Sequence, residues 1–483
     1  MIHHPRPSAP SPVRWIARTL EEAGHETWAV GGAVRDVFLD LESGDWDLAT
    51  HARPEQVRSI FRRTVPIGIE HGTVGVLARD GTLYEVTTFR KDVETDGRHA
   101  VVTFAETIEE DLARRDFTVN ALAWHPLREE LRDPFEGRRD AERRILRTVG
   151  EPDERFVEDY LRILRALRFA GRFGLEIEPA TWTSIVRLVD RVRGLSAERI
   201  RDELLKILDA DPAPARALEL YAESGALEVL YPELAALRAG VAPAREMSTG
   251  PSTSREVAPG VVATGDAASG AAKEEAAAEE AVREPAERPP AATAPTPADP
   301  WSLSVASAAA LPRGRPLLRL AALLRVLSRE DAAALLVRLR LSRAKTNETA
   351  YLAAAPPLPD PDADDATFRR WLSATGPGRL AALGRLELVL ARAECDLGRG
   401  DRVARVVASW RRARRVRADS PPLAVDELAL DGRGLIALGL EPGPGFGRIL
   451  DDLLEWVLED PSRNERAVLS ERALELAGAR TDG

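Results

Sequence analysis

The stretch Val30-Gly31-Gly32-Ala33-Val34-Arg35-Asp36, followed by Asp45-Trp46-Asp47, contains the most informative residues of this 483-residue chain. Two carboxylates one residue apart on a strand point to the same face, because side chains alternate between the two faces. Asp45 and Asp47 are therefore predicted to share a divalent cation. The glycine pair leaves the backbone free to approach a phosphate closely, and Arg35 follows within reach. The stretch predicts a nucleotidyl-transfer site.

Two further segments sharpen this interpretation, since a Gly-Gly turn and an Asp-X-Asp pair each occur in many unrelated loops. Residues 114–121 read Arg-Arg-Asp-Phe-Thr-Val-Asn-Ala, in which two cations and polar turn formers precede an apolar run. Residues 158–169 read Glu-Asp-Tyr-Leu-Arg-Ile-Leu-Arg-Ala-Leu-Arg-Phe. Helical periodicity over residues 157–173 predicts that these acids and arginines lie on one helix.

The predicted helix has a cationic face. At ~100° per residue, Arg165, Arg168 and Arg172 lie within a ~60° arc, and Asp159 and Arg162 lie at its edges. This arrangement predicts a helix whose arginines point toward a triphosphate and an RNA primer. The alternative interpretation is a surface helix that carries a solvated arginine stripe.

The ordered motifs resemble those of tRNA nucleotidyltransferases of the bacterial and eukaryotic class. These are the CCA-adding enzymes, which share the poly(A) polymerase head and belong to the DNA polymerase β superfamily. The matching motifs are Gly-Gly-X-Val-Arg-Asp at 31–36, Asp-X-Asp-X-X-Thr at 45–50, Arg-Arg-Asp-Phe-Thr-X-Asn-Ala at 114–121 and Glu-Asp-X-X-Arg at 158–162. The resemblance implies an α+β amino-terminal head, built on a mixed sheet with helices. It also implies all-α neck, body and tail domains in an elongated multidomain molecule.

The resemblance also implies the metal ligands and the cofactor. Asp45 and Asp47 are expected to hold Mg²⁺, because hard oxygen ligands that leave positions to water and nucleotide oxygens suit this ion. Two such ions would activate the attacking 3′-hydroxyl and stabilise the pyrophosphate leaving group. Glu85, within Tyr84-Glu85-Val86-Thr87, is the candidate third carboxylate. The alternative for Glu85 is an exposed strand glutamate.

The nucleotide is expected to contact residues from all of these segments. Gly32 and Arg35 are expected at the triphosphate, together with the arginines Arg115, Arg165 and Arg168. Asp159 accepts a hydrogen bond from the exocyclic amine that cytosine and adenine carry and uracil lacks, while Arg162 donates to a ring nitrogen or carbonyl. This pair therefore accounts for the exclusion of UTP. Asp116 and Asn120 are expected either to organise their loop or to contact the ribose.

The function that follows is template-independent addition of CCA to tRNA 3′ ends from CTP and ATP, with release of pyrophosphate. The expected partners are tRNA and the two nucleotides; no membrane and no protein partner is predicted. A specialist that adds only CC or only A is a close alternative, and a poly(A) polymerase with the same head is another. A catalytically silent RNA-binding protein is the remaining interpretation.

Composition limits the cellular setting and the RNA surface. No apolar stretch approaches the about 18 to 20 residues that span a bilayer, and the chain has one cysteine, which predicts a cytoplasmic protein. A net charge of -11 argues against indiscriminate nucleic-acid binding. The predicted RNA contacts therefore depend on local clusters, namely Arg187, Arg191, Arg193, Arg199 and Arg201, and the arginines of 402–417.

Shifts in composition predict the domain boundaries. Residues 1–12 are predicted to be disordered, 13–148 to form the catalytic head and 149–210 a helical neck that recognises the base. Residues 211–345 are predicted to form a helical body, and 346–483 a helical tail that binds tRNA. A segment at about 239–300 is rich in Ala, Pro, Glu, Gly, Ser and Thr, and is predicted to be a disordered insertion in the body.

Overall fold

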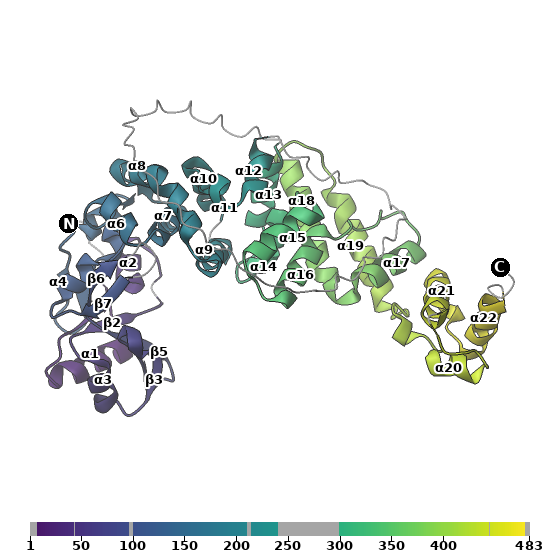
Figure 1. The fold of residues 1–483 in the computed structure, drawn as a ribbon, viewed down its shortest axis with the longest axis horizontal. Coiled ribbons are helices and arrows are strands. Elements are labelled where there is room, and N and C mark those ends of the chain that lie inside the picture. The colour runs from purple at the N-terminus through teal and green to yellow at the C-terminus, as the bar shows by residue number, and fades with distance from the viewer. Residues whose placement is uncertain are drawn as a thin grey trace, which may run out of the picture.

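The computed structural model describes residues 7–42, 44–95, 100–209, 214–239, 299–443 and 445–478. The described part of the chain is an elongated arch with a strand-containing head at one end (Figure 1). Helices continue from the head to α20–α22 at the other end of the arch. The predicted fold class, an α+β head followed by helical domains, is confirmed.

The head is built on one mixed sheet with the strand order β3-β4-β5-β2-β1-β8-β9. Strands β2 and β5 run parallel, while the other neighbours pair antiparallel. The strands are β1 (Thr27–Val30), β2 (Asp47–Thr50), β3 (Thr64–Gly68), β4 (Thr73–Leu77), β5 (Leu83–Thr88), β8 (Ala123–His125) and β9 (Glu130–Arg132). A separate hairpin consists of β6 (Arg90–Thr95) and β7 (Ala100–Phe104).

The two faces of the sheet have different coverings. Helices α1 (Ser11–Glu22) and α3 (Pro54–Ile60) pack on one face, where Leu48 and Val86 are buried. On the other face, Trp28 and Val30 belong to a second hydrophobic cluster that includes residues of α4 (Ile108–Ala113). The cleft described below lies on this second face, where Val30 and Ala49 contribute to its lining.

The rest of the head and the helical part comprise many short elements. In the head these are α2 (Gly32–Phe38), η1 (Ile69–His71), η2 (Thr118–Asn120), α5 (Gly137–Glu142) and β10 (Ile145–Leu146). Helices α6 (Pro152–Glu158), α7 (Leu161–Phe173), α8 (Pro179–Leu188), η3 (Val189–Gly194) and α9 (Ala197–Asp209) follow, with β11 (Glu176–Ile177) between α7 and α8. Next come α10 (Ala215–Ser224), α11 (Ala226–Leu230), α12 (Pro232–Arg238), α13 (Pro300–Ala309), α14 (Pro316–Leu324), α15 (Arg329–Arg338) and α16 (Arg343–Ala354). The last elements are α17 (Asp365–Thr375), η4 (Pro377–Arg379), α18 (Leu380–Asp396), α19 (Val403–Ala418), η5 (Val425–Glu427), α20 (Gly432–Ala437), α21 (Gly445–Glu459), η6 (Pro461–Arg463) and α22 (Arg466–Gly478).

The prediction of one continuous helix over residues 157–173 is wrong. The chain leaves the helix at Asp159, whose backbone is extended with φ -157° and ψ 104°. Asp159 Oδ1 accepts a hydrogen bond from the Leu161 backbone N–H at 3.0 Å, so the side chain satisfies a donor in the first turn of α7. Periodicity extends across this break because α6 and α7 both present apolar residues to the core, and a local cap residue is enough to interrupt them.

The helical domains contain two hydrophobic clusters. The larger cluster runs from the head through the helices and includes residues of α13, α14 and α18, which pack on one another. A separate cluster of α20, α21 and α22 begins at Leu428. The domain boundaries, including the division at residue 346, stay predictions.

The predicted insertion lies almost wholly outside the described residues. Helices α12 and α13, which flank it, pack directly against each other. Deletion of residues 245–298 is therefore expected to leave nucleotide incorporation within about twofold and the melting temperature nearly unchanged, because the helices that border it keep their contact. Thermal unfolding and turnover of the deletion variant test this, and loss of cooperative unfolding would contradict it.

Candidate active site

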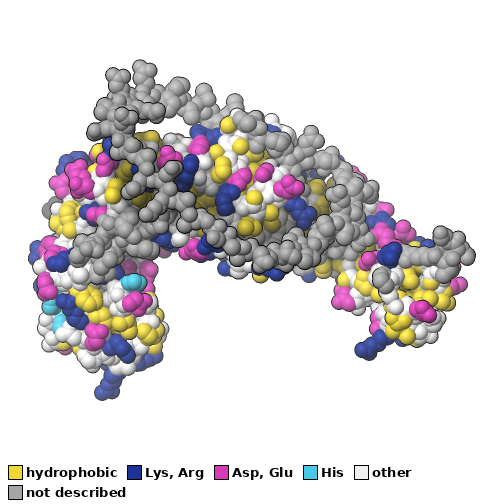
Figure 2. Space-filling model, in the orientation of Figure 1, with side chains coloured by type: hydrophobic (Ala, Val, Ile, Leu, Met, Phe, Trp, Pro, Cys, Tyr) yellow, Lys and Arg dark blue, Asp and Glu magenta, His cyan; other side chains and the backbone are white. Residues whose placement is uncertain are grey.

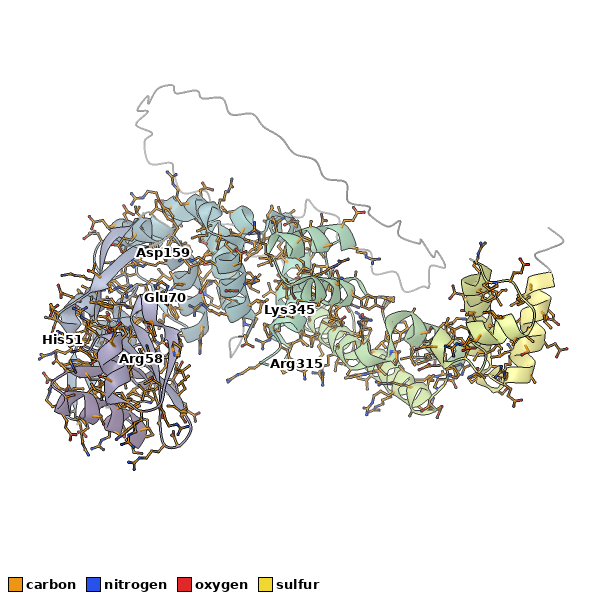
Figure 3. The ribbon with its side chains drawn as sticks, turned by 60° about the horizontal axis from the view of Figure 1, so that its bottom comes forward. His51, Arg58, Glu70, Asp159, Arg315 and Lys345 are labelled. Carbon is orange, nitrogen blue, oxygen red and sulfur yellow. The ribbon has the colours of Figure 1, made fainter. Side chains whose placement is uncertain are left out.

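A cleft of about 440 Å³ lies where the head sheet meets the start of α7. Figure 3 labels Asp159 at this junction, between the head and the helices that follow. Asp45 and Arg168 are not part of the cleft lining. The predicted residues that line the cleft are Gly32, Arg35, Asp47, Glu85, Arg115, Asp159, Arg162 and Arg165.

The carboxylates Asp47 and Glu85 lie on neighbouring strands. The register pairs Leu48 with Val86, which places Asp47 and Glu85 side by side one residue earlier. Asp45 is exposed just before β2, and Trp46 between the two aspartates is buried. Burial raises the pKa of Asp47 to about 6, with further contributions from Asp45 and Glu85 and a partial offset from Arg115. The three carboxylates therefore interact electrostatically.

This donor set fits a divalent cation that keeps part of its hydration shell. No group of three or more His, Cys, Asp or Glu side chains among the described residues is arranged to hold a metal ion by itself. Mg²⁺ is usually bound by one or two carboxylates together with waters and substrate phosphates, so fewer than three protein ligands suit this ion. Burial of Asp47, with added repulsion from Asp45 and Glu85, raises its pKa, and a bound cation would relieve this cost.

The glycine turn brings α2 close to these carboxylates. Gly31 has φ +75°, a backbone conformation that residues with a side chain rarely adopt. A Cβ at Gly31 would lie 3.4 Å from Asp47 Oδ2 and 3.6 Å from Arg115 Nη1. Glycine at position 31 thus lets the turn before α2 lie next to both an acidic and a basic group of the cleft.

A polar network connects the head to α7 along the wall of the cleft. Arg165 Nε donates to Asp116 Oδ2 at 2.7 Å, and Asn120 Nδ2 donates to Asp116 Oδ1 at 2.9 Å. Arg35 Nη1 in turn donates to Asn120 Oδ1 at 2.8 Å, and its Nη2 to Asp36 Oδ1 at 2.7 Å. Asp116 and Asn120 thus organise their loop and the wall of the site, which is the first of the two roles that the sequence predicts for them.

The Asp116 carboxylate is strongly stabilised in its ionised form. Burial by itself raises the pKa of Asp116, but the Arg165 guanidinium and the Asn120 amide outweigh it and lower this pKa to about 2. Because the pKa falls below its usual value near 3.8, ionised Asp116 stabilises the fold above about pH 4, and this contribution disappears as the pH falls through about 2.

Asp116→Asn is therefore expected to lower the free energy of unfolding by about 2 kcal/mol at pH 7, and by roughly half as much at pH 3. Urea denaturation of both proteins at the two pH values measures the difference. An equal loss at pH 3 and pH 7 would show that the charge of Asp116 is not the source of its stabilisation.

Arg115 connects the cleft to the β6–β7 hairpin. Its Nη2 donates to Asp111 Oδ2 at 3.2 Å and its Nη1 to the Asn120 carbonyl at 3.1 Å. Asp111 Oδ1 also accepts from the Arg90 backbone N–H at 3.1 Å, at the first residue of the hairpin. The sequence singled out Arg115 but gave no signal for Asp111, which is buried on α4.

The two candidate base-reading residues are held by different partners. Asp159 Oδ2 accepts from Arg199 Nη2 at 2.6 Å. Arg162 Nη1 donates to the carboxylate of Glu158 and to the Arg155 carbonyl, the latter at 3.0 Å, and its Nη2 donates to the Arg114 carbonyl at 3.2 Å. Both side chains line the cleft and are fixed at its rim.

Arg168 occupies a different position from the one its helical phase predicts. It is 5% exposed, and its Nε donates to Glu203 Oε2 at 2.6 Å. Helical phase places Arg168 beside Arg165, but α9 packs on that side of α7 and supplies the buried Glu203. The arginine face of α7 is therefore divided between the cleft and a buried ion pair.

Several arginines of the predicted RNA-binding clusters have acidic partners in the fold. Arg187 pairs with Asp153, and Arg193 lies 3.6 Å from Asp190. In the second cluster, Arg402 pairs with Glu387 at 3.1 Å. Basic and acidic side chains are interspersed on the face seen in Figure 2. Composition does not show which residues pair in the fold. Because these arginines have acidic partners, the net basic charge of each cluster is smaller than the sequence suggests.

The chain is similar to known protein families and to curated proteins. Residues 27–147 match the family model of the poly A polymerase head domain, and 174–237 match the model named "Probable RNA and SrmB- binding site of polymerase A". The CCA-adding enzyme of Anoxybacillus flavithermus is 46% identical over 222 residues, 46% of this chain and 55% of that protein. That of Geobacillus stearothermophilus is 45% identical over 222 residues, covering 46% and 54%. The chain thus matches about half the length of these curated relatives.

Solved structures extend the similarity. The Bacillus stearothermophilus CCA-adding enzyme in complex with CTP has a TM-score of 0.67 at 27% identity, covering 98% of this chain and 100% of that one. A CCA-adding enzyme in complex with ATP has a TM-score of 0.54 at 20% identity, covering 96% and 94%, which shows the fold alone. Among the described residues, no helix is long and apolar enough to cross a membrane.

Proposed function

Because the chain carries the poly A polymerase head and belongs to the nucleotidyltransferase family that shares it, we propose that it adds CCA to tRNA 3′ ends. CTP and ATP are the donors and pyrophosphate is released. The observation that carries this proposal is one cleft that joins Asp47 and Glu85 of the head to Asp159 and Arg162 of the neck. Nucleotide transfer without a template requires the catalytic carboxylates and the base-recognising residues to lie no further apart than the length of one nucleotide.

The head residues supply the chemistry of transfer. The family implies dependence on a divalent metal, and we propose that Asp45 and Asp47 hold Mg²⁺, with Glu85 as the third carboxylate. A metal held there would lower the pKa of the attacking 3′-hydroxyl and would stabilise the charge on the leaving pyrophosphate. Asp47 and Glu85 lie on adjacent strands and both line the cleft in which the reacting phosphate is proposed to lie.

The triphosphate is proposed to lie along the basic wall of the cleft. Gly32 offers its backbone N–H, and Arg35, Arg115 and Arg165 offer guanidinium groups. These arginines also have protein partners, which orient them before the nucleotide arrives. Arg168 does not line this wall, but its buried pair with Glu203 positions α7, which carries Arg165.

Asp159 and Arg162 are proposed to imitate a Watson-Crick partner. The Asp159 carboxylate accepts from the exocyclic amine of cytosine or adenine, and Arg162 donates to a ring acceptor. Uracil presents a carbonyl where the amine would be, so two acceptors would face each other and UTP is rejected. The helical domains, whose fold matches that of CCA-adding enzymes along nearly the whole chain, are proposed to bind tRNA in the cytoplasm.

A poly(A) polymerase is the second candidate, since the head matches the model of that name. The decisive experiment supplies labelled CTP and ATP, separately and together, with Mg²⁺, to tRNA transcripts that end before CCA, after C and after CC. Extension of all three that stops at CCA supports the proposal. Extension of only one set of ends identifies a CC-adding or A-adding specialist, and long A tracts on unrelated RNA identify a poly(A) polymerase. Binding of RNA without incorporation identifies a non-catalytic protein.

A further inference from the structure

Arg199 contacts the candidate base-reading carboxylate although it does not line the cleft. It lies in the first turn of α9, 40 residues after Asp159, and its Nη2 donates to Asp159 Oδ2 at 2.6 Å. The side chains are 26% and 23% exposed, respectively. Asp159, labelled in Figure 3, therefore both lines the cleft and contacts Arg199.

Two donors fix the plane of the Asp159 carboxylate. Oδ1 accepts from the Leu161 backbone N–H at 3.0 Å, while Oδ2 accepts from Arg199. A carboxylate rotates freely about its Cβ–Cγ bond when one oxygen is held loosely, but donors on both oxygens remove that freedom. Each oxygen has a second lone pair, so the held carboxylate is still able to accept from a ligand.

The support for Arg199 is itself rigid. Arg168 of α7 and Glu203 of α9 form an ion pair between these two helices at 2.6 Å, with both residues almost fully buried. Glu203 follows Arg199 by four residues, one helical turn, so the two pairs lie on the same side of α9. The helix that carries Arg199 is thus held against α7, which begins two residues after Asp159.

We propose that Arg199 is a positioning residue for nucleobase selection. It holds the Asp159 carboxylate so that the remaining lone pairs meet the exocyclic amine of cytosine or adenine, and it does not itself touch the nucleotide. Without Arg199 the carboxylate turns, loses its alignment with the amine and relieves its repulsion from the uracil carbonyl. This inference rests on the proposed function, because it assigns Asp159 to base recognition.

The test compares CTP with UTP in Arg199→Ala, Arg199→Lys and the matched control Arg216→Ala. Arg216 is 52% exposed on α10, where it pairs with Glu223, and its removal takes away the same charge without touching Asp159. In Arg199→Ala the ratio of kcat/KM for CTP to that for UTP is expected to fall about tenfold, mainly through KM. The lysine variant is expected to recover part of this ratio, and Arg216→Ala to keep it.

A double-mutant cycle with Asp159→Ala shows whether Arg199 acts through Asp159. Arg199→Ala is expected to have little further effect on the ratio in the Asp159→Ala background. An unchanged ratio in Arg199→Ala, or full additivity in the cycle, would overturn the inference. Calorimetry of CTP and UTP binding in the absence of RNA makes the same comparison without turnover. Wild-type protein that binds CTP more tightly than UTP but incorporates neither would refute the proposed function, while the binding ratio of the Arg199 variants would still decide the inference.

Discussion

Replacement of Asp47 by asparagine is expected to abolish nucleotide incorporation and, in the absence of metal, to stabilise the folded protein. Turnover should fall by about 10³-fold or more, because the variant loses a charged group that is proposed to hold the metal at the reacting phosphate. Stability should rise because burial and the neighbouring Asp45 and Glu85 raise the pKa of Asp47 to about 6 in the fold. The ionised carboxylate therefore destabilises the native state above that pH.

The sign and range of this effect follow from linkage. Folding raises the pKa from 3.8 to about 6, so the penalty is absent below about pH 4, grows between these values and is complete above about pH 6. Asp47→Asn is expected to gain about 2 kcal/mol at pH 8 with a chelator present, and almost nothing at pH 3.5. Denaturation at the two pH values measures this gain.

Glu22→Gln is the matched control for Asp47→Asn. Glu22 is an exposed carboxylate at the end of α1, the helix that packs on the opposite face of the sheet. Its replacement removes one negative charge from the head and is expected to leave activity and stability nearly unchanged. If Asp47→Asn were no more stable than wild type at pH 8, the carboxylates would not repel one another in the way proposed.

Arg162→Ala is expected to produce the largest loss of nucleotide selection among the arginine variants. The variant loses the proposed charged donor to the base, worth about 1.5 to 3 kcal/mol, so kcat/KM for CTP and ATP should fall roughly 10- to 100-fold. It also leaves the Glu158 carboxylate and the Arg114 carbonyl without the Arg162 guanidinium. Steady-state kinetics with all four nucleoside triphosphates measures both turnover and selection.

Arg187→Ala provides the comparison for Arg162→Ala. Arg187 is exposed on α8 and pairs with Asp153, away from the cleft lining. Its removal is expected to weaken tRNA binding a few-fold in a salt-dependent manner, with nucleotide selection unchanged. Equal loss of selection in the two variants would contradict the assignment of Arg162 to the base.

Local sequence patterns predicted the head with few errors. The β-branched runs at residues 73–77 and 84–88 form β4 and most of β5, and the amphipathic stretch at residues 13–23 forms most of α1. These elements depend on alternation, helical period and β-branched content, all of which are written in neighbouring residues. That Asp47 and Glu85 lie side by side depends on the strand order, which periodicity does not reveal. Glu85 became a candidate only through the superfamily resemblance.

The sequence by itself determined the chemistry available to this protein: a carboxylate pair behind a glycine turn, an arginine motif and an acid and arginine at the start of a helix. Only the tertiary structure decided how those groups are used. It interrupted the helix at Asp159, brought Arg199 to that carboxylate and turned Arg168 toward Glu203. The physical reason is that helical period specifies the face of a side chain, whereas its partner comes from a segment 35 to 40 residues away that packing alone brings into contact.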